Sequence, residues 1–190
     1  MKAVALERLR ASLAECPVVK FGDYDYFVHP ITDGIPLGDP KILGEAADGL
    51  ARLGDWSRCD KIVTAESMGF PLAAVLSMKT GKPYVFIRKR RYGLPGEVSL
   101  SQLTGYSKTD MFINFIRPGD RLIFVDDVIS TGGTLYAIVK ALRSLRAEVV
   151  DVLIVFEKTK EKARMEKDLG LKIKTLLRVE VRDGKLVERA

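Results

Sequence analysis

The sequence predicts an α/β domain with a mainly parallel sheet flanked by helices, on the strength of two observations. Its clearest strand candidates are continuous apolar runs, which are expected where helices cover both faces of a sheet. Most of these runs are followed by a turn and then by a segment with helical periodicity, the alternation typical of parallel α/β sheets. The strand candidates are residues 61–65, 84–87, 121–125 and 149–156. No linker-like stretch divides the chain, so residues 1–190 are expected to form a single domain.

The segments before this alternation are predicted from local patterns. Leucines recur at helical spacing over residues 2–15, which indicates an amphipathic helix. Residues 23–28 alternate polar and aromatic side chains, as a half-buried strand does. Prolines and glycines make residues 30–40 a turn-rich connection. A second helix is expected over residues 40–53.

Helices are also expected after the first, third and fourth strands, at residues 69–80, 133–146 and 159–168. Residues 88–116 interrupt this order with a basic run, glycines, a proline and two strand-like pieces near 97–103 and 110–116, on either side of a turn at residues 105–107. A long excursion inside a compact domain is usually functional, often as a lid. The role of residues 177–181 near the C-terminus, at the sheet edge or at a pocket, stays open at this stage.

Composition narrows the function classes. The net charge is +6, from 31 basic and 25 acidic residues, which suits a polyanionic ligand without choosing between nucleic acid, a membrane surface and a phosphorylated small molecule. Cys16 and Cys59 form no CxxC pair and His29 is the sole histidine, so a zinc site and a His-based triad are excluded. No run approaches the roughly 18 apolar residues of a membrane helix. A cytoplasmic protein is expected.

The chemistry is concentrated after the third strand. Ligands of open parallel sheets bind at the carboxyl ends of strands, and here a strand ends in Asp126 and Asp127. Next comes a group of small or hydroxyl-bearing residues at a predicted helix start: Ser130, Thr131, Gly132, Gly133 and Thr134. Glycine amides, hydroxyls and the helix N-terminus together suit a phosphate group. The two carboxylates would repel phosphate, so ribose hydroxyls or Mg²⁺ are their natural partners. The lysine of a Walker loop is missing.

Residues 122–134 resemble the signature of type I phosphoribosyltransferases that binds 5-phosphoribosyl-1-diphosphate (PRPP). The resemblance extends over residues 18–180 and is strongest to archaeal-type hypoxanthine/guanine phosphoribosyltransferases, with adenine phosphoribosyltransferase as a near relative. It implies the type I phosphoribosyltransferase fold, with an N-terminal hood over residues 18–36 and a flexible hairpin loop over residues 88–116.

The function implied by the resemblance is purine salvage. Such a pentosyl-transferring glycosyltransferase converts hypoxanthine, and also guanine, with PRPP to IMP or GMP and diphosphate. Mg²⁺ would arrive on PRPP near Asp126 and Asp127, with no metal ligand of the protein assigned. Family members are commonly homodimers, and neither nucleic acid nor a membrane is an expected partner.

The resemblance also implies roles for particular residues. The 5-phosphate is expected on Ser130, Thr131, Gly132, Gly133 and Thr134. The diphosphate is expected on Glu66, Ser67, Met68, Gly69, Arg88 and Lys89. The base is expected against Phe27, Val28, Val128 and Ile129, and the catalytic set is Asp126, Asp127 and Glu97. Another branch of the family has a third acidic residue where this chain has Ser130, so the purine ring proton would pass to Glu97, to water or to a backbone carbonyl.

Three alternatives remain open. An adenine phosphoribosyltransferase forming AMP would share the mechanism. A non-catalytic PRPP-sensing regulator would need a DNA-binding module, and no helix-turn-helix is recognisable before the first core strand. A nucleic-acid-binding domain using the basic residues 88–91 would leave the aspartate pair unexplained.

Overall fold

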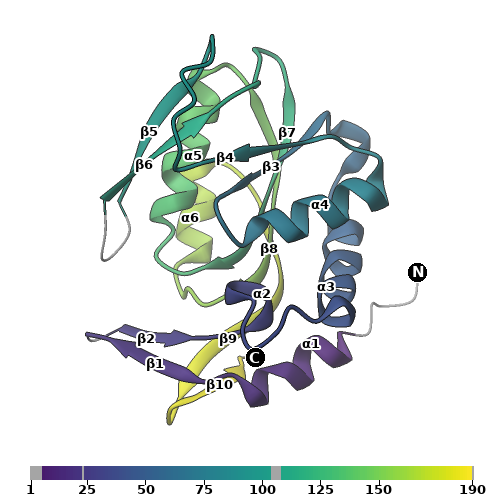
Figure 1. The fold of residues 1–190 in the computed structure, drawn as a ribbon, viewed down its shortest axis with the longest axis vertical. Helices are drawn as coiled ribbons and strands as arrows, with labels where there is room; N and C mark the ends of the chain where they lie inside the picture. The colour runs from purple at the N-terminus through teal and green to yellow at the C-terminus, as the bar shows by residue number, and fades with distance from the viewer. Residues whose placement is uncertain (1–5, 23, 104–107, 190) are drawn as a thin grey trace.

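The computed structural model describes residues 6–22, 24–103 and 108–189. A six-stranded sheet forms its centre, in the order β10-β9-β8-β7-β3-β4 (Figure 1). Five of these strands are parallel to their neighbours, and β10 pairs antiparallel to β9. The strands are β3 (Lys61–Ala65), β4 (Tyr84–Ile87), β7 (Arg121–Ile129), β8 (Glu148–Glu157), β9 (Ile173–Arg182) and β10 (Lys185–Glu188). The predicted, mainly parallel sheet is confirmed.

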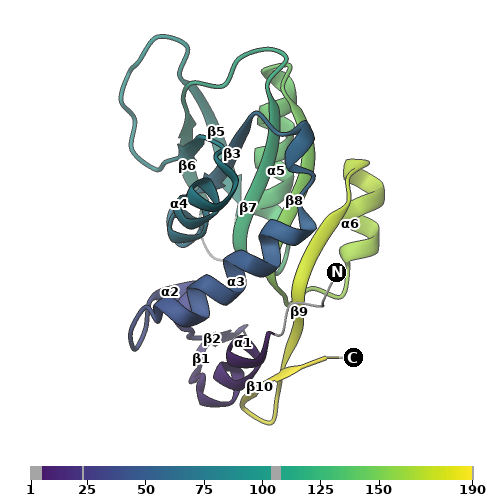
Figure 2. The same ribbon diagram turned by 90° about the vertical axis from the view of Figure 1, so that its right-hand side faces the viewer.

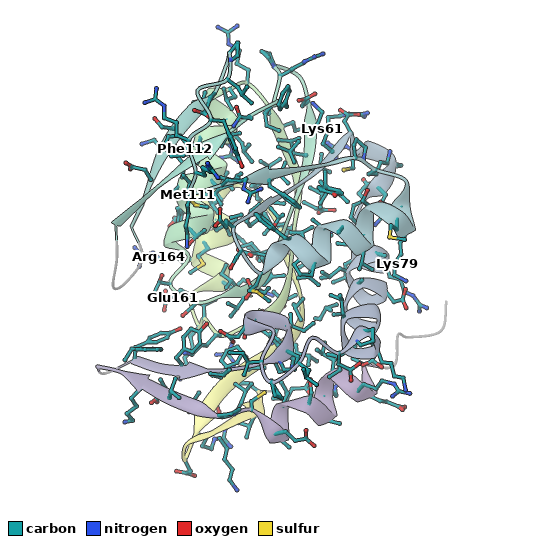
Figure 3. All side chains as sticks on the ribbon, viewed as in Figure 1. Lys61, Lys79, Met111, Phe112, Glu161 and Arg164 are labelled. Carbon is teal, nitrogen blue, oxygen red and sulfur yellow. The ribbon has the colours of Figure 1, made fainter. Side chains whose placement is uncertain are left out.

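Helices cover both faces of the sheet, as Figure 2 shows. They are α3 (Pro40–Leu53), α4 (Gly69–Thr80), α5 (Gly133–Ser144) and α6 (Lys162–Leu169). Alternate residues of β7 belong to two separate hydrophobic cores. Ile123 and Val125 pack on the side of α3 and α4, and Leu122 and Phe124 pack on the side of α5 and α6. Because both faces of β7 are buried, its sequence is apolar without alternation. Figure 3 shows side chains filling the space on both sides of the sheet.

Two hairpins stand outside the main sheet. The first joins β1 (Val18–Phe21) to β2 (Tyr24–Phe27), and the second joins β5 (Val98–Leu103) to β6 (Lys108–Ile113). Met111 of β6, labelled in Figure 3, is buried in the core on the α5 side. The second hairpin corresponds to the two strand-like pieces predicted within residues 88–116. The turn predicted at residues 105–107 lies outside the described residues.

The N-terminal elements differ from the predictions. Instead of one helix over residues 2–15, there is α1 (Glu7–Ala11) followed by a 3₁₀ turn, Ser12–Glu15, and residues 2–5 lie outside the described ranges. The Ser12 hydroxyl donates to the Leu9 carbonyl oxygen (2.8 Å), which competes with the regular helical hydrogen bond. Strand β1 was not predicted, because four residues are too few to show a periodicity, and its apolar side chains are largely exposed.

Three further elements correct the sequence-based boundaries. The connection over residues 30–40 contains a single helical turn, α2 (Pro30–Asp33), which ends at Gly34 in the left-handed conformation. A short 3₁₀ turn, Trp56–Arg58, precedes β3. Strand β7 continues to Ile129, four residues beyond the predicted end, so the aspartate pair lies within the strand.

At the C-terminus, β9 and β10 form an antiparallel hairpin at the edge of the sheet, which answers the question left open for residues 177–181. In the described ranges no helix is long and apolar enough to cross a membrane.

His29 is a fully buried structural residue that joins three elements. Its Nδ1 accepts a hydrogen bond from the Ile31 amide (2.9 Å), and its Nε2 lies 2.8 Å from the Ser12 hydroxyl oxygen. The ring meets Phe156 of β8 edge to face, with centroids 4.9 Å apart. Since Nδ1 is an acceptor, the proton of the neutral ring is on Nε2. Burial lowers the pKa of His29 to about 4, against the opposing effect of Asp33.

The lowered pKa predicts that His29 makes stability depend on pH between about 6.5 and 4. In this window the unfolded chain binds a proton at His29 and the folded chain does not, so stability falls as the pH falls. The advantage of the wild type over His29→Gln, in free energy of unfolding, should shrink by about 2–3 kcal/mol between pH 7.5 and pH 4. Urea unfolding of both proteins across this range measures it, and a constant difference would contradict the assignment.

Candidate active site

A phosphate cup forms where β7 passes into α5. Gly132, the N-cap of α5, has a φ of 79°, in the left-handed region. This backbone conformation favours glycine, and a Cβ at this position would also lie 2.7 Å from the Met165 Cε atom, so the end of that flexible side chain would have to move. The turn places the hydroxyls of Ser130, Thr131 and Thr134 at the N-terminus of a 12-residue helix. This combination of amides, hydroxyls and positive helix dipole is suited to a phosphate.

A cavity of about 280 Å³ opens beside the phosphate cup. Its lining includes Ser130, Thr131, Gly132 and Thr134 from the cup and Asp126, Val128 and Ile129 from the preceding strand. Aromatic residues of the β1–β2 hairpin line it from a second side: Phe21, Tyr24 and Tyr26. Phe124, Leu135 and Ile154 form an apolar wall. One cavity therefore combines hydroxyls at a helix N-terminus, which suit a phosphate, with a carboxylate and an aromatic surface.

The aspartate pair is electrostatically unfavourable without a ligand. The Asp127 amide donates to Asp126 Oδ1 (3.1 Å), which holds the two residues close together. Burial raises the pKa of Asp126 to about 6. Burial and then the neighbouring charge of Asp126 raise the pKa of Asp127 well above its usual value. A cation or hydroxyl donors from a ligand would relieve this repulsion.

The donor set of this pair fits Mg²⁺, because carboxylate oxygens are the hard ligands this ion prefers. Within residues 6–22, 24–103 and 108–189, however, no group of three or more metal-ligating side chains surrounds them. The remaining ligands would have to be substrate oxygens or water, which suits an ion delivered by a phosphorylated substrate.

The turn between β3 and α4 lies beside the cup, because β3 and β7 are adjacent parallel strands. This turn comprises Glu66, Ser67, Met68 and Gly69, and its Glu66–Ser67 peptide bond is cis. A Cβ on Gly69 would lie 1.8 Å from the Thr64 hydroxyl oxygen and 3.2 Å from the Val125 carbonyl oxygen. Glycine at this position lets the turn pack directly on the ends of both strands.

The structure brings the predicted cations to the same turn. Glu66 Oε2 accepts a hydrogen bond from the Lys89 amide (3.0 Å) and lies 3.8 Å from Arg88 Nε. The Arg88 guanidinium lies over the Phe70 ring, 5.4 Å from its centroid. The six residues predicted to hold a diphosphate, 66–69 with Arg88 and Lys89, therefore form one spatial group.

Two predicted base-contacting residues lie away from the cavity. Phe27 is 4% exposed and packs edge to face on Phe156 in the core, and Val28 lines a separate hollow near Cys16 and Pro17. Residues on a strand alternate between its faces, so Tyr24 and Tyr26 face the cavity when Phe27 faces the core. The same alternation in the sequence is the signal that could have identified the two tyrosines. Val128 and Ile129 do line the cavity.

Glu97 holds the basic loop together in this structure. Its carboxylate accepts hydrogen bonds from the Tyr92 amide (2.9 Å), the Gly93 amide (3.0 Å) and Asn114 Nδ2 (3.0 Å). The bond from the Tyr92 amide is the main cause of a lowered Glu97 pKa. Glu97 is not among the residues that line the cavity.

A family model for phosphoribosyl transferase domains matches residues 41–175. The chain belongs to the phosphoribosyl transferase family. Within the family, a protein named hypoxanthine/guanine phosphoribosyltransferase from Methanocaldococcus infernus is 53% identical over 180 residues, 95% of this chain and 98% of that relative. A relative of the same name from Methanocaldococcus jannaschii is 49% identical over 179 residues, 94% of this chain and 98% of its own length.

Solved structures of phosphoribosyltransferases share the fold. Adenine phosphoribosyltransferase from Thermoanaerobacter pseudethanolicus has a TM-score of 0.74 and 25% identity, covering 92% of this chain and 99% of that one. The enzyme of the same name from Saccharomyces cerevisiae has a TM-score of 0.71 and 23% identity, covering 90% and 98%. The predicted type I phosphoribosyltransferase fold and the prediction of a phosphoribosyl-transferring enzyme are thus confirmed.

The raised pKa of Asp126 predicts that Asp126→Asn stabilises the phosphoribosyltransferase in the absence of ligand. Above about pH 6 the wild type carries a buried charge that the variant lacks, and near pH 4 the wild-type carboxyl is mostly protonated. The variant should therefore be more stable at pH 7.5, by on the order of 1–3 kcal/mol, and lose this gain near pH 4. Urea unfolding at both pH values measures the effect. A variant no more stable than the wild type at pH 7.5 would contradict it.

Proposed function

We propose that this phosphoribosyltransferase salvages purines, joining the ribose of PRPP to hypoxanthine or guanine and releasing diphosphate. The observation that carries the proposal is the cavity that combines the phosphate cup at residues 130–134, the carboxylate of Asp126 and the aromatic hood. Relatives of about half identical sequence and nearly equal length bear the name hypoxanthine/guanine phosphoribosyltransferase, which supports the choice of base.

In this proposal, the 5-phosphate of PRPP binds at the N-terminus of α5 and its ribose hydroxyls donate to Asp126 and Asp127. These hydrogen bonds would lower the raised pKa values of the two carboxyls, because each hydrogen bond donated to a carboxylate favours its charged form. The diphosphate would lie along residues 66–69, between Arg88 and Lys89. Bound Mg²⁺ would neutralise part of the diphosphate charge.

The reaction needs no covalent intermediate with the protein. A ring nitrogen of the base forms a bond to the anomeric carbon of ribose, while the bond from that carbon to the diphosphate oxygen breaks. The electron pair of the broken bond leaves with the diphosphate. Arg88, Lys89 and the amides of residues 66–69 would stabilise the negative charge that develops there. A positively charged, oxocarbenium-like ribose would develop beside the carboxylates of Asp126 and Asp127.

The ring nitrogen loses a proton in this step, and Glu97 is the proposed side-chain acceptor. To act there, it must release the amides of Tyr92 and Gly93, which hold it in the loop in this structure. A closure of residues 88–116 over the cavity would supply that rearrangement and exclude water.

Glu97→Gln tests the acceptor role. The amide oxygen of glutamine can still accept hydrogen bonds from the loop, whereas the side chain cannot take a proton. A general base predicts a fall in kcat of about 10²- to 10⁴-fold with little change in KM. An unchanged kcat, measured with saturating PRPP and Mg²⁺, would restrict Glu97 to shaping the loop.

The choice of base separates the proposal from its alternatives. Purified protein with PRPP and Mg²⁺ should form nucleotide from hypoxanthine and guanine, assayed one base at a time beside adenine and xanthine. Product from adenine alone would replace the proposal with an adenine phosphoribosyltransferase. No product with any base, together with a rise in melting temperature on adding PRPP, would support a PRPP-sensing regulator.

We also propose a cytoplasmic homodimer that pairs through the face formed by α4 and β4. The polar side chains of α4 are Ser77, Lys79 and Thr80, and the rest of the helix is apolar on its inner and outer faces. Lys79, labelled in Figure 3, pairs with Asp48 of α3 (2.7 Å). Helices that are apolar all round are normally covered on both sides. Beside α4, Phe70 stacks on Phe86 of the end strand β4 with centroids 3.8 Å apart.

Charges placed on this face should separate the subunits. Met78 is 87% exposed and Tyr84 is 44% exposed. The double variant Met78→Asp/Tyr84→Asp is expected to sediment as a monomer, because burying an unpaired carboxylate in an interface is strongly unfavourable. Val19→Asp, a similar change on the outer hairpin, is the control and should remain dimeric. A double variant that stays dimeric would place the interface elsewhere.

A further inference from the structure

The hood and the phosphate cup are joined by a hydrogen bond between two side chains. The Tyr24 hydroxyl oxygen lies 3.0 Å from the Ser130 hydroxyl oxygen. Tyr24 belongs to β2 of the hood, and Ser130 is the first residue of the cup. They are 106 positions apart in the chain, and both line the cavity. The bond therefore connects the part of the cavity that suits a base with the part that suits a phosphate.

The hood, β1 and β2, depends on side-chain contacts such as that of Tyr24 for its position. Strands β1 and β2 pair with each other and stand apart from the six-stranded sheet (Figure 1). Phe27 anchors one end of β2 in the core, while Val19 and Phe21 of β1 are 40% and 60% exposed. An isolated two-stranded hairpin is marginally stable in water. Contacts at the outer end of β2 therefore contribute strongly to its position.

Lys158 reinforces the same point of attachment. Its ammonium nitrogen lies 3.7 Å from the centroid of the Tyr24 ring and donates a hydrogen bond to the Asp25 carbonyl oxygen. The Lys158 amide donates to the Ile129 carbonyl oxygen (2.9 Å), so the backbone of this lysine, just after β8, lies beside the end of β7, which leads into the cup. The Tyr24 ring is thus fixed by a cation–π contact, and its hydroxyl is directed at Ser130.

Bound phosphate would decide which hydroxyl donates in the hydrogen bond between Tyr24 and Ser130. Each hydroxyl has one hydrogen to donate and can accept hydrogen bonds as well. A phosphate dianion only accepts, so Ser130 must donate its hydrogen to the phosphate. Its oxygen then accepts from Tyr24, which gives a chain from Tyr24 through Ser130 to the phosphate. In such chains each bond polarises and strengthens the next.

We infer that Tyr24 is a positioning residue that couples occupancy of the phosphate cup to closure of the hood. Phosphate on the cup strengthens the bond from Tyr24 to Ser130 and holds β1 and β2 over the cavity. Occupancy of the cup by the phosphoribosyl substrate thereby stabilises the aromatic wall that Tyr24 and its neighbours present to the base. The inference rests on the proposed function, since it requires a phosphoribosyl ligand on residues 130–134.

Tyr24→Phe tests this coupling, because it removes the hydroxyl and keeps the ring that contacts Lys158. Amide hydrogen exchange is followed in residues 18–27 and 130–136 of the full chain, with and without ribose 5-phosphate. In the wild type, ribose 5-phosphate should slow exchange in both segments. In Tyr24→Phe the slowing at residues 130–136 should remain, while that at residues 18–27 should be about 3- to 10-fold weaker. The KM for the base should rise with little change in the KM for PRPP.

Tyr26→Phe is the matched control. It removes a hydroxyl from the same strand, but that hydroxyl donates to Asp33 Oδ1 (2.7 Å) within the N-terminal region. Its response to ribose 5-phosphate at residues 18–27 should match the wild type. Equal slowing at residues 18–27 in Tyr24→Phe and the wild type would overturn the coupling. The coupling would also be overturned if ribose 5-phosphate slowed amide exchange in the wild type at residues 130–136 alone. No response in either segment would overturn the phosphate site itself, and with it the proposed function.

Discussion

Two carboxylates held side by side near the C-terminal end of a central strand, β7, are the constraint on which this site depends. Burial raises the pKa values of Asp126 and Asp127, and the charge of Asp126 raises the pKa of Asp127 further. The charged pair is therefore electrostatically unfavourable until a ligand binds there. The neighbouring cup has the opposite character, with amides and a helix N-terminus that favour anions. A ligand with a phosphate at one end and hydroxyls or a bound cation next to it satisfies both. The electrostatics of this short segment therefore select a phosphorylated sugar more specifically than the net charge of the chain does.

The parallel sheet brings further segments of the chain next to the aspartate pair and the cup. Because β3, β7 and β8 run in the same direction, their carboxyl ends meet at one edge, and the turn at residues 66–69, the cup and Lys158 become neighbours. Gly69 and Gly132 permit the close approach of these turns, each where a Cβ would meet another atom at less than 3.0 Å. The turn at residues 66–69 and the cup at residues 130–134, proposed for the diphosphate and the 5-phosphate, are thus both built on strand ends. In this proposal, backbone groups rather than long side chains would contribute much of the phosphate binding.

The base region is built differently. Its aromatic surface comes from a two-stranded hairpin that is attached by Phe27 at one end and by Tyr24 and Lys158 at the other. The cavity-facing residues of this hairpin, Phe21, Tyr24 and Tyr26, lie outside the two cores of the sheet, so they can change without disturbing them. Under the proposed function, this division fits one fold shared by relatives named for hypoxanthine and guanine and by structures named for adenine. The proposed phosphoribosyl site lies on the sheet, and the hood is where the choice of base would differ.

The sequence by itself determined the central strands, the helices that follow them and the phosphate cup. Strands and helices such as residues 61–65, 69–80 and 84–87 have the predicted limits, because their apolar patterns are local and continuous. Tertiary structure decided what local patterns do not encode. The face of β2 that meets the core depends on Phe156, far along the chain, and that contact turns Phe27 inward and the tyrosines toward the cavity. The closing of the sheet edge by β10 and the hydrogen bonds that hold Glu97 in its loop likewise depend on pairings the sequence does not display. In each case the outcome depends on pairings between particular residues, either near in the sequence, as in the β9–β10 hairpin, or distant, as for Phe27 and Phe156. Periodicity carries no record of such pairings.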